Sequence, residues 1–195
     1  MHIITSEEEK AYFTRAAKHR SLHDLGRLIV NQGMRPDEAL SLAKSDVYLE
    51  RGQVQIQKGK SPAARRALDL THDSRVILAR RLAGSSPWIF PGRLPGEHMG
   101  RLNGAHDRLC QKAGEDGIML NFVLYDFRHT FATRMAQAGD DLATLAAILG
   151  HNSIRIVQKY VHPTSEHKRA ATALYDQTQK DLAKKQAEEA ERRAN

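Results

Sequence analysis

Apolar side chains recur at helical spacing along most of the chain. Leu22, Leu25 and Ile29 lie three to four positions apart and are followed by Gly33, a pattern typical of an amphipathic helix that ends at a glycine. Similar spacing, with a capping residue or a proline at several of the starts, predicts further helices over residues 6–18, 36–45, 73–82, 98–113, 126–138, 141–149 and 153–160, and a helical tail from residue 165.

Two short stretches alternate in the manner of strands instead. Polar and apolar residues alternate over 53–57 and again over 66–70, and the segment 58–62 between them contains the glycine and proline of a turn. This pattern predicts an antiparallel hairpin. The fold class is therefore mainly α with a small antiparallel β-sheet (α+β).

Composition narrows the class of protein. The 195 residues are enough for one domain with a real core, and 41% of them are apolar. Lys and Arg outnumber Asp and Glu by 30 to 23, which suits a polyanionic partner, although many basic proteins bind no nucleic acid. The single cysteine, Cys110, excludes an internal disulfide framework and a cysteine-rich zinc site, and it fits a reducing cytosol. Neither a membrane span nor a signal peptide is predicted.

The first candidate for chemistry is Arg35, which directly precedes Pro36 and the helix predicted to begin there. Free N–H groups at a helix N-terminus favour anions, and an arginine beside them adds a bidentate ligand for phosphate. Taken alone, this segment favours a solvated surface arginine.

A second candidate pair lies at the start of the helix predicted over 126–138. Tyr125 and Arg128 are three positions apart and share one helix face, whereas Phe127 and Phe131 face the core. An ordinary amphipathic helix with an exposed arginine is the alternative explanation.

The third candidate pair follows the helix that is predicted to stop at Gly150. His151 comes directly after the glycine, and Tyr160 lies nine positions later. Taken alone, the histidine fits a cap or a surface group, and the tyrosine fits a half-buried packing residue.

Together these segments resemble the tyrosine recombinase, or phage integrase, family. The segment G-M-R-P-D-E is similar to the family's first arginine box, and Y-D-F-R-H-T-F-A-T, L-G-H and Q-K-Y-V-H-P resemble its second. The turn G-K-S at 59–61, followed by A-R-R, is similar to the family's lysine-bearing β-turn. The resemblance covers roughly residues 5 to 165 and implies the catalytic-domain fold of that family.

The resemblance implies that Tyr160 attacks a DNA phosphate and forms a 3′-phosphotyrosine, which a 5′-hydroxyl of the partner strand then attacks. A phenol, with a pKa of about 10, needs an electrophilic target and a destination for its proton. Arg35 and Arg128 would hold the charge that builds on the phosphate, and His151 would donate a further hydrogen bond. The protein link keeps the bond energy, so no metal, ATP or other cofactor is implied.

Three further positions complete the expected site. Lys60 is the candidate general acid for the leaving 5′-oxygen, with Lys58 as its competitor. Glu38 would orient active-site groups or form a structural salt bridge. Tyr125 stands where the family carries His, sometimes Lys. A tyrosine can hydrogen-bond a phosphate or relay a proton, but it is not cationic at neutral pH, which puts a general-base role for this position in doubt.

The expected organisation is a catalytic DNA breaking-rejoining domain over residues 1–165 and a helical tail over 166–195. The tail would pack on a neighbouring protomer or be disordered. The first arginine box begins at residue 33, so the helical core-binding domain that family members carry before it is expected to be absent. DNA binding by this chain is then expected to be weak and strongly salt-dependent.

The expected partner is double-stranded DNA, with the protein a monomer alone and a tetramer on DNA. The expected location is the cytoplasm of a prokaryote or phage host, in association with the nucleoid and with no membrane contact. Two alternatives stay open: a type IB topoisomerase-like nicking-closing enzyme, and a catalytically impaired DNA-binding protein.

Overall fold

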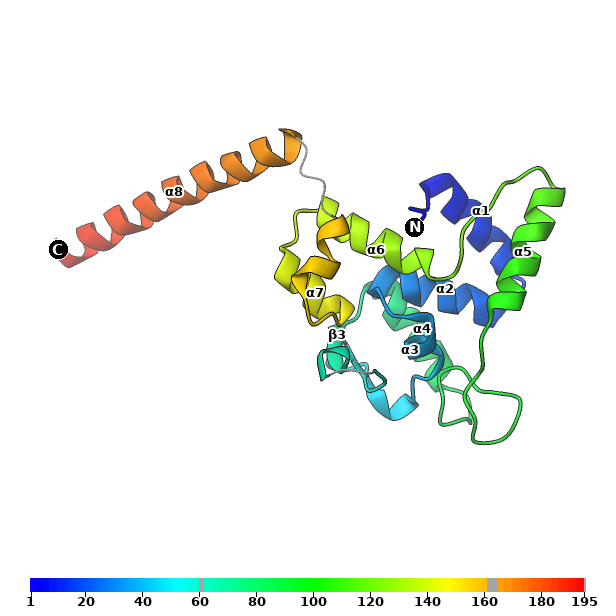
Figure 1. Cartoon of the computed structure of the whole chain (residues 1–195). Coiled ribbons are helices and arrows are strands. Elements are labelled where there is room, and N and C mark those ends of the chain that lie inside the picture. Colours follow the sequence, from blue (N-terminus) through cyan, green and yellow to red (C-terminus); the bar gives the residue numbers. More distant parts are fainter. Residues whose placement is uncertain (60–61, 161–164, 195) are drawn as a thin grey trace. The chain divides into compact units, whose positions relative to one another are not determined.

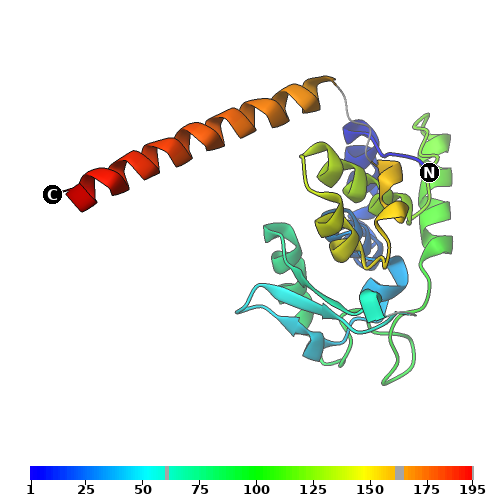
Figure 2. The ribbon, with the colours of Figure 1, turned by 60° about the vertical axis from the view of Figure 1, so that its left-hand side comes forward.

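The computed structural model describes residues 1–59, 62–160 and 165–194 and divides the chain into two units. The first unit is Met1–Tyr160 (Figures 1 and 2). The second is Val161–Asn195, whose described part is one helix, α8 (Ser165–Ala194). A helical tail is therefore confirmed. No helix in the described ranges is long and apolar enough to cross a membrane.

The first unit is mainly helical, as the sequence predicts. Local capping explains where several helices begin and end: Thr5 and Glu8 form a capping box at the first helix, and Asp141 caps the last one, which ends at Gly150 in the left-handed conformation. The helices are α1 (Ser6–Ala16), α2 (Arg20–Gln32), α3 (Pro36–Leu40), α4 (His72–Leu82), α5 (Asn103–Glu115), α6 (Asp126–Gln137) and α7 (Leu142–Leu149).

Short 3-10 turns connect several of these elements. They are η1 (Lys44–Asp46), η2 (Pro62–Ala64), η3 (Ile154–Ile156) and η4 (Gln158–Tyr160). The helix predicted over 153–160 is therefore wrong in type, since the chain makes two 3-10 turns there. The helix predicted over 36–45 is too long, because α3 ends at Leu40.

The predicted hairpin is confirmed and has a third strand. Strands β1 (Val47–Tyr48), β2 (Gln53–Ile56) and β3 (Arg66–Asp69) form an antiparallel sheet in the order β1-β2-β3 (Figure 2). Val54 pairs with Leu68, and both side chains are buried on the same face. Strand β1 has only two residues, too few for an alternating pattern to reveal it.

The core forms around α2, which packs against α1, α3, α4 and α6 (Figure 1). Its apolar face is fully buried at Leu25, Leu28 and Ile29. A second, smaller cluster lies between α6, α7 and the last two 3-10 turns, and Tyr160 belongs to it. This arrangement brings the N-termini of α3 and α6 and the C-terminus of α7 together.

The helix predicted over 98–113 begins five residues later than expected, at Asn103. The stretch before it pairs with the Trp88 loop instead, because Met99 N–H donates to the Phe90 carbonyl at 2.7 Å and Pro91 bridges His98. Such pairing between distant loops leaves no periodic signal in the sequence.

Candidate active site

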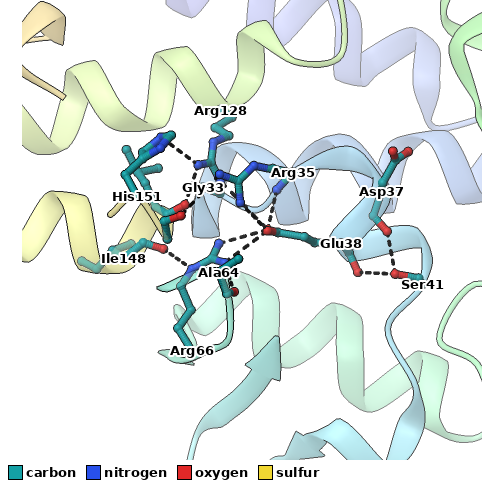
Figure 3. A network of polar contacts seen from close by, with 12 residues as sticks. Gly33, Arg35, Asp37, Glu38, Ser41, Ala64, Arg66, Arg128, Ile148 and His151 are labelled. Atoms are coloured by element: carbon teal, nitrogen blue, oxygen red, sulfur yellow. Dashed lines mark hydrogen bonds and ion pairs between the residues drawn. The ribbon is translucent and has the colours of Figure 1, made fainter. Parts of the chain in front are cut away.

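Three arginines from different elements converge on one buried carboxylate, that of Glu38 (Figure 3). Arg35 and Arg66 donate hydrogen bonds to it, and Arg128 Nη1 lies 4.0 Å from its Oε2. Glu38 of α3 is 5% exposed. Its carboxylate accepts hydrogen bonds from Arg66 Nη1 at 3.2 Å and Arg66 Nη2 at 3.0 Å. It also accepts hydrogen bonds from Arg35 Nη1 at 2.6 Å and from the Arg35 backbone N–H at 2.9 Å. Burial raises the pKa of Glu38, but the bonds and charge of Arg66 and the bonds from Arg35 outweigh it and hold the pKa below its usual value. Glu38 is therefore an anion in the interior.

The same three arginines bind the last carbonyls around the end of α7. Arg66 Nε donates to Ile148 O at 2.5 Å, Arg128 Nη2 to Leu149 O at 2.5 Å, and Arg35 Nη2 to Gly150 O at 3.4 Å. Carbonyls at a helix C-terminus lack intrahelical partners and carry the negative end of the helix dipole, so cations are favoured there. The end of α7 thus positions the three arginines, and their hydrogen bonds in turn hold the chain in place just before His151.

Arg128, on the first turn of α6, is fully buried. Its Nη1 also donates to Gly33 O at 2.5 Å, and its Nη2 lies 3.2 Å from His151 Nε2. Burial lowers the pKa of Arg128 to about 10, so the guanidinium stays charged at neutral pH. Arg128 Nε is buried with no hydrogen-bond partner in the part of the chain that the structure describes. A buried guanidinium with an unused N–H is a donor for an anion.

His151 directly follows Gly150, whose positive φ of 67° ends α7. Because a guanidinium can only donate, the 3.2 Å contact makes His151 Nε2 the acceptor and leaves the ring proton on Nδ1. Burial, and then the charges of Arg128 and Arg35, lower the pKa of His151 to about 4. The imidazole is therefore neutral at neutral pH and has one N–H to donate.

A cavity of about 660 Å³ opens beside this network. Charged and polar side chains from four separate segments line it, and cations outnumber carboxylates: Arg35, Lys58 and Arg101, then Asp37 and Glu38, with Asn103 and Tyr125. The Tyr125 ring is half-exposed, and the Arg128 guanidinium lies 5.9 Å from its centroid. The cavity has the charge and the size to receive a phosphate group.

Tyr160 is buried, with 4% of its surface exposed, and its hydroxyl points to a different partner. The hydroxyl lies 2.7 Å from His129 Nδ1. Burial raises the pKa of Tyr160, and the charge of Arg128 offsets part of this rise. In the described residues no hydrogen bond joins this hydroxyl to Arg35, Arg128 or His151. Tyr160 therefore lies near the arginine network but not in contact with it.

Four of the expected site residues come together directly: Arg35, Glu38, Arg128 and His151. Tyr125 lines the adjoining cavity, and Tyr160 is buried with its hydroxyl on His129. Lys60 falls outside the described residues, whereas Lys58 is exposed and lines the cavity. Among the described residues, no group of three or more His, Cys, Asp or Glu side chains could hold a metal ion.

Sequence reasoning missed the parts played by Arg66 and His129. Arg66 shares the inward face of β3 with Leu68, and a basic residue at an inward strand position is a signal that it has a buried partner. His129 follows Arg128 in the sequence, but only the fold reveals its contact with Tyr160.

Comparisons with known proteins identify sequences and structures that are similar to this chain. A model of the phage integrase family matches residues 4–167. The tyrosine recombinase XerD of Caulobacter vibrioides is 32% identical over 160 residues, covering 72% of this chain and 48% of XerD. The chain spans about half the length of the curated relatives it matches.

Solved structures share the fold. The Tn1549 transposon integrase, solved in complex with transposon right end DNA, superposes with a TM-score of 0.77 at 19% identity, over 90% of this chain and 66% of that one. The catalytic domain of bacteriophage HP1 integrase gives a TM-score of 0.65 at 19% identity, over 89% of this chain and 94% of that domain.

Proposed function

The chain belongs to the phage integrase family, and from that premise we propose that it is the catalytic domain of a site-specific DNA recombinase with Tyr160 as the nucleophile. The observation that carries this proposal is the convergence of Arg35, Arg128 and His151 beside a basic cavity. A recombinase of this kind breaks and rejoins double-stranded DNA through a 3′-phosphotyrosine.

The arginines would bind the non-bridging oxygens of the scissile phosphate. Arg35 keeps 30% of its side chain exposed, so it meets an incoming phosphate first. Arg128 contributes the unused Nε donor, and His151 contributes its Nδ1–H. Donors fixed in advance stabilise the charge that develops on the phosphate without reorganising during the reaction.

Tyr160 would then attack the phosphorus, and the 5′-oxygen would leave. The hydroxyl is hydrogen-bonded to His129, so DNA binding must bring the phosphorus within reach of Tyr160 Oη. Lys60 is the proposed general acid for the 5′-oxygen, with Lys58 as the alternative that lines the cavity. Tyr125 would contact the phosphate from the cavity wall, and Glu38 would hold the arginines in place.

The proposed domain organisation follows the same division. Residues 1–165 would form the catalytic domain, in keeping with the compact unit that ends at Tyr160. Residues 166–195 would pack as a helix on a neighbouring protomer of a tetramer assembled on DNA. The long, largely exposed α8 supports this role, since Leu174 and Tyr175 are 69% and 64% exposed.

The test uses half-site DNA duplexes. The arm that the protein binds has a random sequence, and the cleaved strand carries a nick just beyond the cleavage position. Cleavage releases the short fragment between the cleavage position and the nick. Without the 5′-hydroxyl of this fragment the strand cannot be rejoined, so the covalent protein–DNA adduct accumulates. We expect an adduct with the 195-residue chain and none with Tyr160→Phe. An adduct that persists in Tyr160→Phe, or a wild-type chain that forms none, contradicts the proposal.

A further inference from the structure

The hydroxyl of Tyr160 meets a base that the proposed reaction has not yet used. His129 Nδ1 lies 2.7 Å from it, and the two rings are tilted with centroids 5.7 Å apart. This is the one side-chain hydrogen bond of Tyr160 in the described part of the chain. We propose that His129 is the catalytic residue that accepts the proton of Tyr160 during attack and returns it during rejoining. The inference rests on the proposed function.

The position of His129 on α6 suits this role. It follows Arg128, the buried phosphate ligand proposed above, so one helical turn carries both groups. The His129 ring also packs edge-on against Tyr125, with centroids 5.1 Å apart. The cavity wall, the base and the nucleophile are therefore consecutive neighbours, in the order Tyr125, His129, Tyr160.

Tyr125 does not serve as this base. A neutral phenol accepts a proton poorly, because its conjugate acid is far stronger than an imidazolium. Its hydroxyl also makes no hydrogen bond to Tyr160 in the described residues, whereas the imidazole of His129 does. A histidine one turn further along the same helix supplies what the tyrosine lacks.

His129 is in the right protonation state to act. Burial lowers its pKa, and so do the charges of Lys159 on η4, the chain's amino terminus and Arg128, while Asp126 on its own helix raises it. The imidazole is thus neutral at neutral pH. With its proton on Nε2, the Nδ1 lone pair accepts the Tyr160 hydroxyl.

The step balances without any further reactant. The bond between Tyr160 Oη and phosphorus forms while the bond from phosphorus to the 5′-oxygen breaks, and the phenol proton passes to His129 Nδ1. The 5′-oxygen takes its proton from the general acid. In rejoining, a 5′-hydroxyl gives its proton back to the general acid, now in its basic form, and attacks the phosphotyrosine. The bond to Oη breaks, and His129 returns the proton to Oη.

The test compares rates of adduct formation on one nicked duplex, the one that the wild-type chain selects from the randomised pool described above. His129→Ala removes the base and the hydrogen bond, while His129→Asn places an acceptor oxygen near the position of Nδ1 but cannot take up a proton. His72→Asn is the matched control, since His72 is exposed at the start of α4. We expect both His129 variants to react about 10²- to 10⁴-fold more slowly than wild type, and His72→Asn to react at the wild-type rate.

The outcomes separate the two proposals. A wild-type chain that forms no Tyr160 adduct overturns the proposed function and the inference together. An active wild type with His129→Asn equally fast overturns the inference alone, because a hydrogen bond without basicity then suffices. His129→Ala faster than wild type also overturns it, since His129 would then hold the hydroxyl back.

Discussion

Replacing Glu38 by Gln tests whether its buried negative charge holds the arginine network together. Glu38 accepts four hydrogen bonds from Arg35 and Arg66, two on each oxygen. The amide keeps one acceptor oxygen and turns the other into a donor that faces two donors. Two bonds to a charged acceptor are lost, and the buried guanidinium of Arg66 loses its counter-charge. We expect Glu38→Gln to lower the free energy of unfolding by about 3–5 kcal/mol.

Urea unfolding followed by the fluorescence of the single tryptophan, Trp88, measures this change. Asp37→Asn is the matched control, because Asp37 is the neighbouring carboxylate on the same helix and is exposed. It should change the free energy of unfolding by about 0.5 kcal/mol or less. A Glu38→Gln variant no less stable than Asp37→Asn would show that the network contributes no net stability, and the reasoning would fail.

Three further predictions concern the same region. Gly33→Ala should destabilise the fold by roughly 1–3 kcal/mol in thermal unfolding, because φ is 64° and a Cβ would lie 2.5 Å from Phe131; an unchanged midpoint would contradict this. Arg66→Met combined with Glu38→Gln should cost clearly less than the two single changes together, as a double-mutant cycle in urea would show; simple additivity would mean that the pair is uncoupled. The folded-state pKa of His151, about 4, lies below the usual 6.5, so the unfolded chain takes up its proton first as the pH falls. Stability should therefore drop between about pH 6.5 and 4, and less steeply in His151→Asn; identical slopes would refute the shift.

The sequence predicts the local parts of the site well. Arg35 occupies the N-cap position of α3 because Pro36 sets the helix start. Gly33 and Gly150 both end helices in the left-handed conformation, which glycine adopts readily because it has no Cβ. Local chemistry determines each of these features, so short-range patterns reveal them. The hairpin between β2 and β3 is predictable for the same reason.

Features that depend on contacts between distant segments escape such patterns. The buried pairing of Glu38 with Arg66 joins residues 28 positions apart, and the contact of Arg128 with Gly33 spans 95. The hydroxyl of Tyr160 faces His129, 31 positions earlier, which only the packing of α6 against η4 brings about. A resemblance to a family predicts which residues react, but it does not show which side chain each of them contacts.

The proposed phosphate binding is more closely tied to folding at Arg128 than at Arg35. Arg128 is fully buried, and it donates to carbonyls at the ends of α2 and α7. Its removal would leave those carbonyls and Glu38 short of partners in the interior, a loss of stability of the same kind as an unpaired buried charge. Arg35 reaches Glu38 and the last carbonyl from the rim of the cavity, with 30% of its side chain exposed. We therefore expect substitution of Arg35 to affect the proposed phosphate binding more than stability, whereas substitution of Arg128 should change both at once.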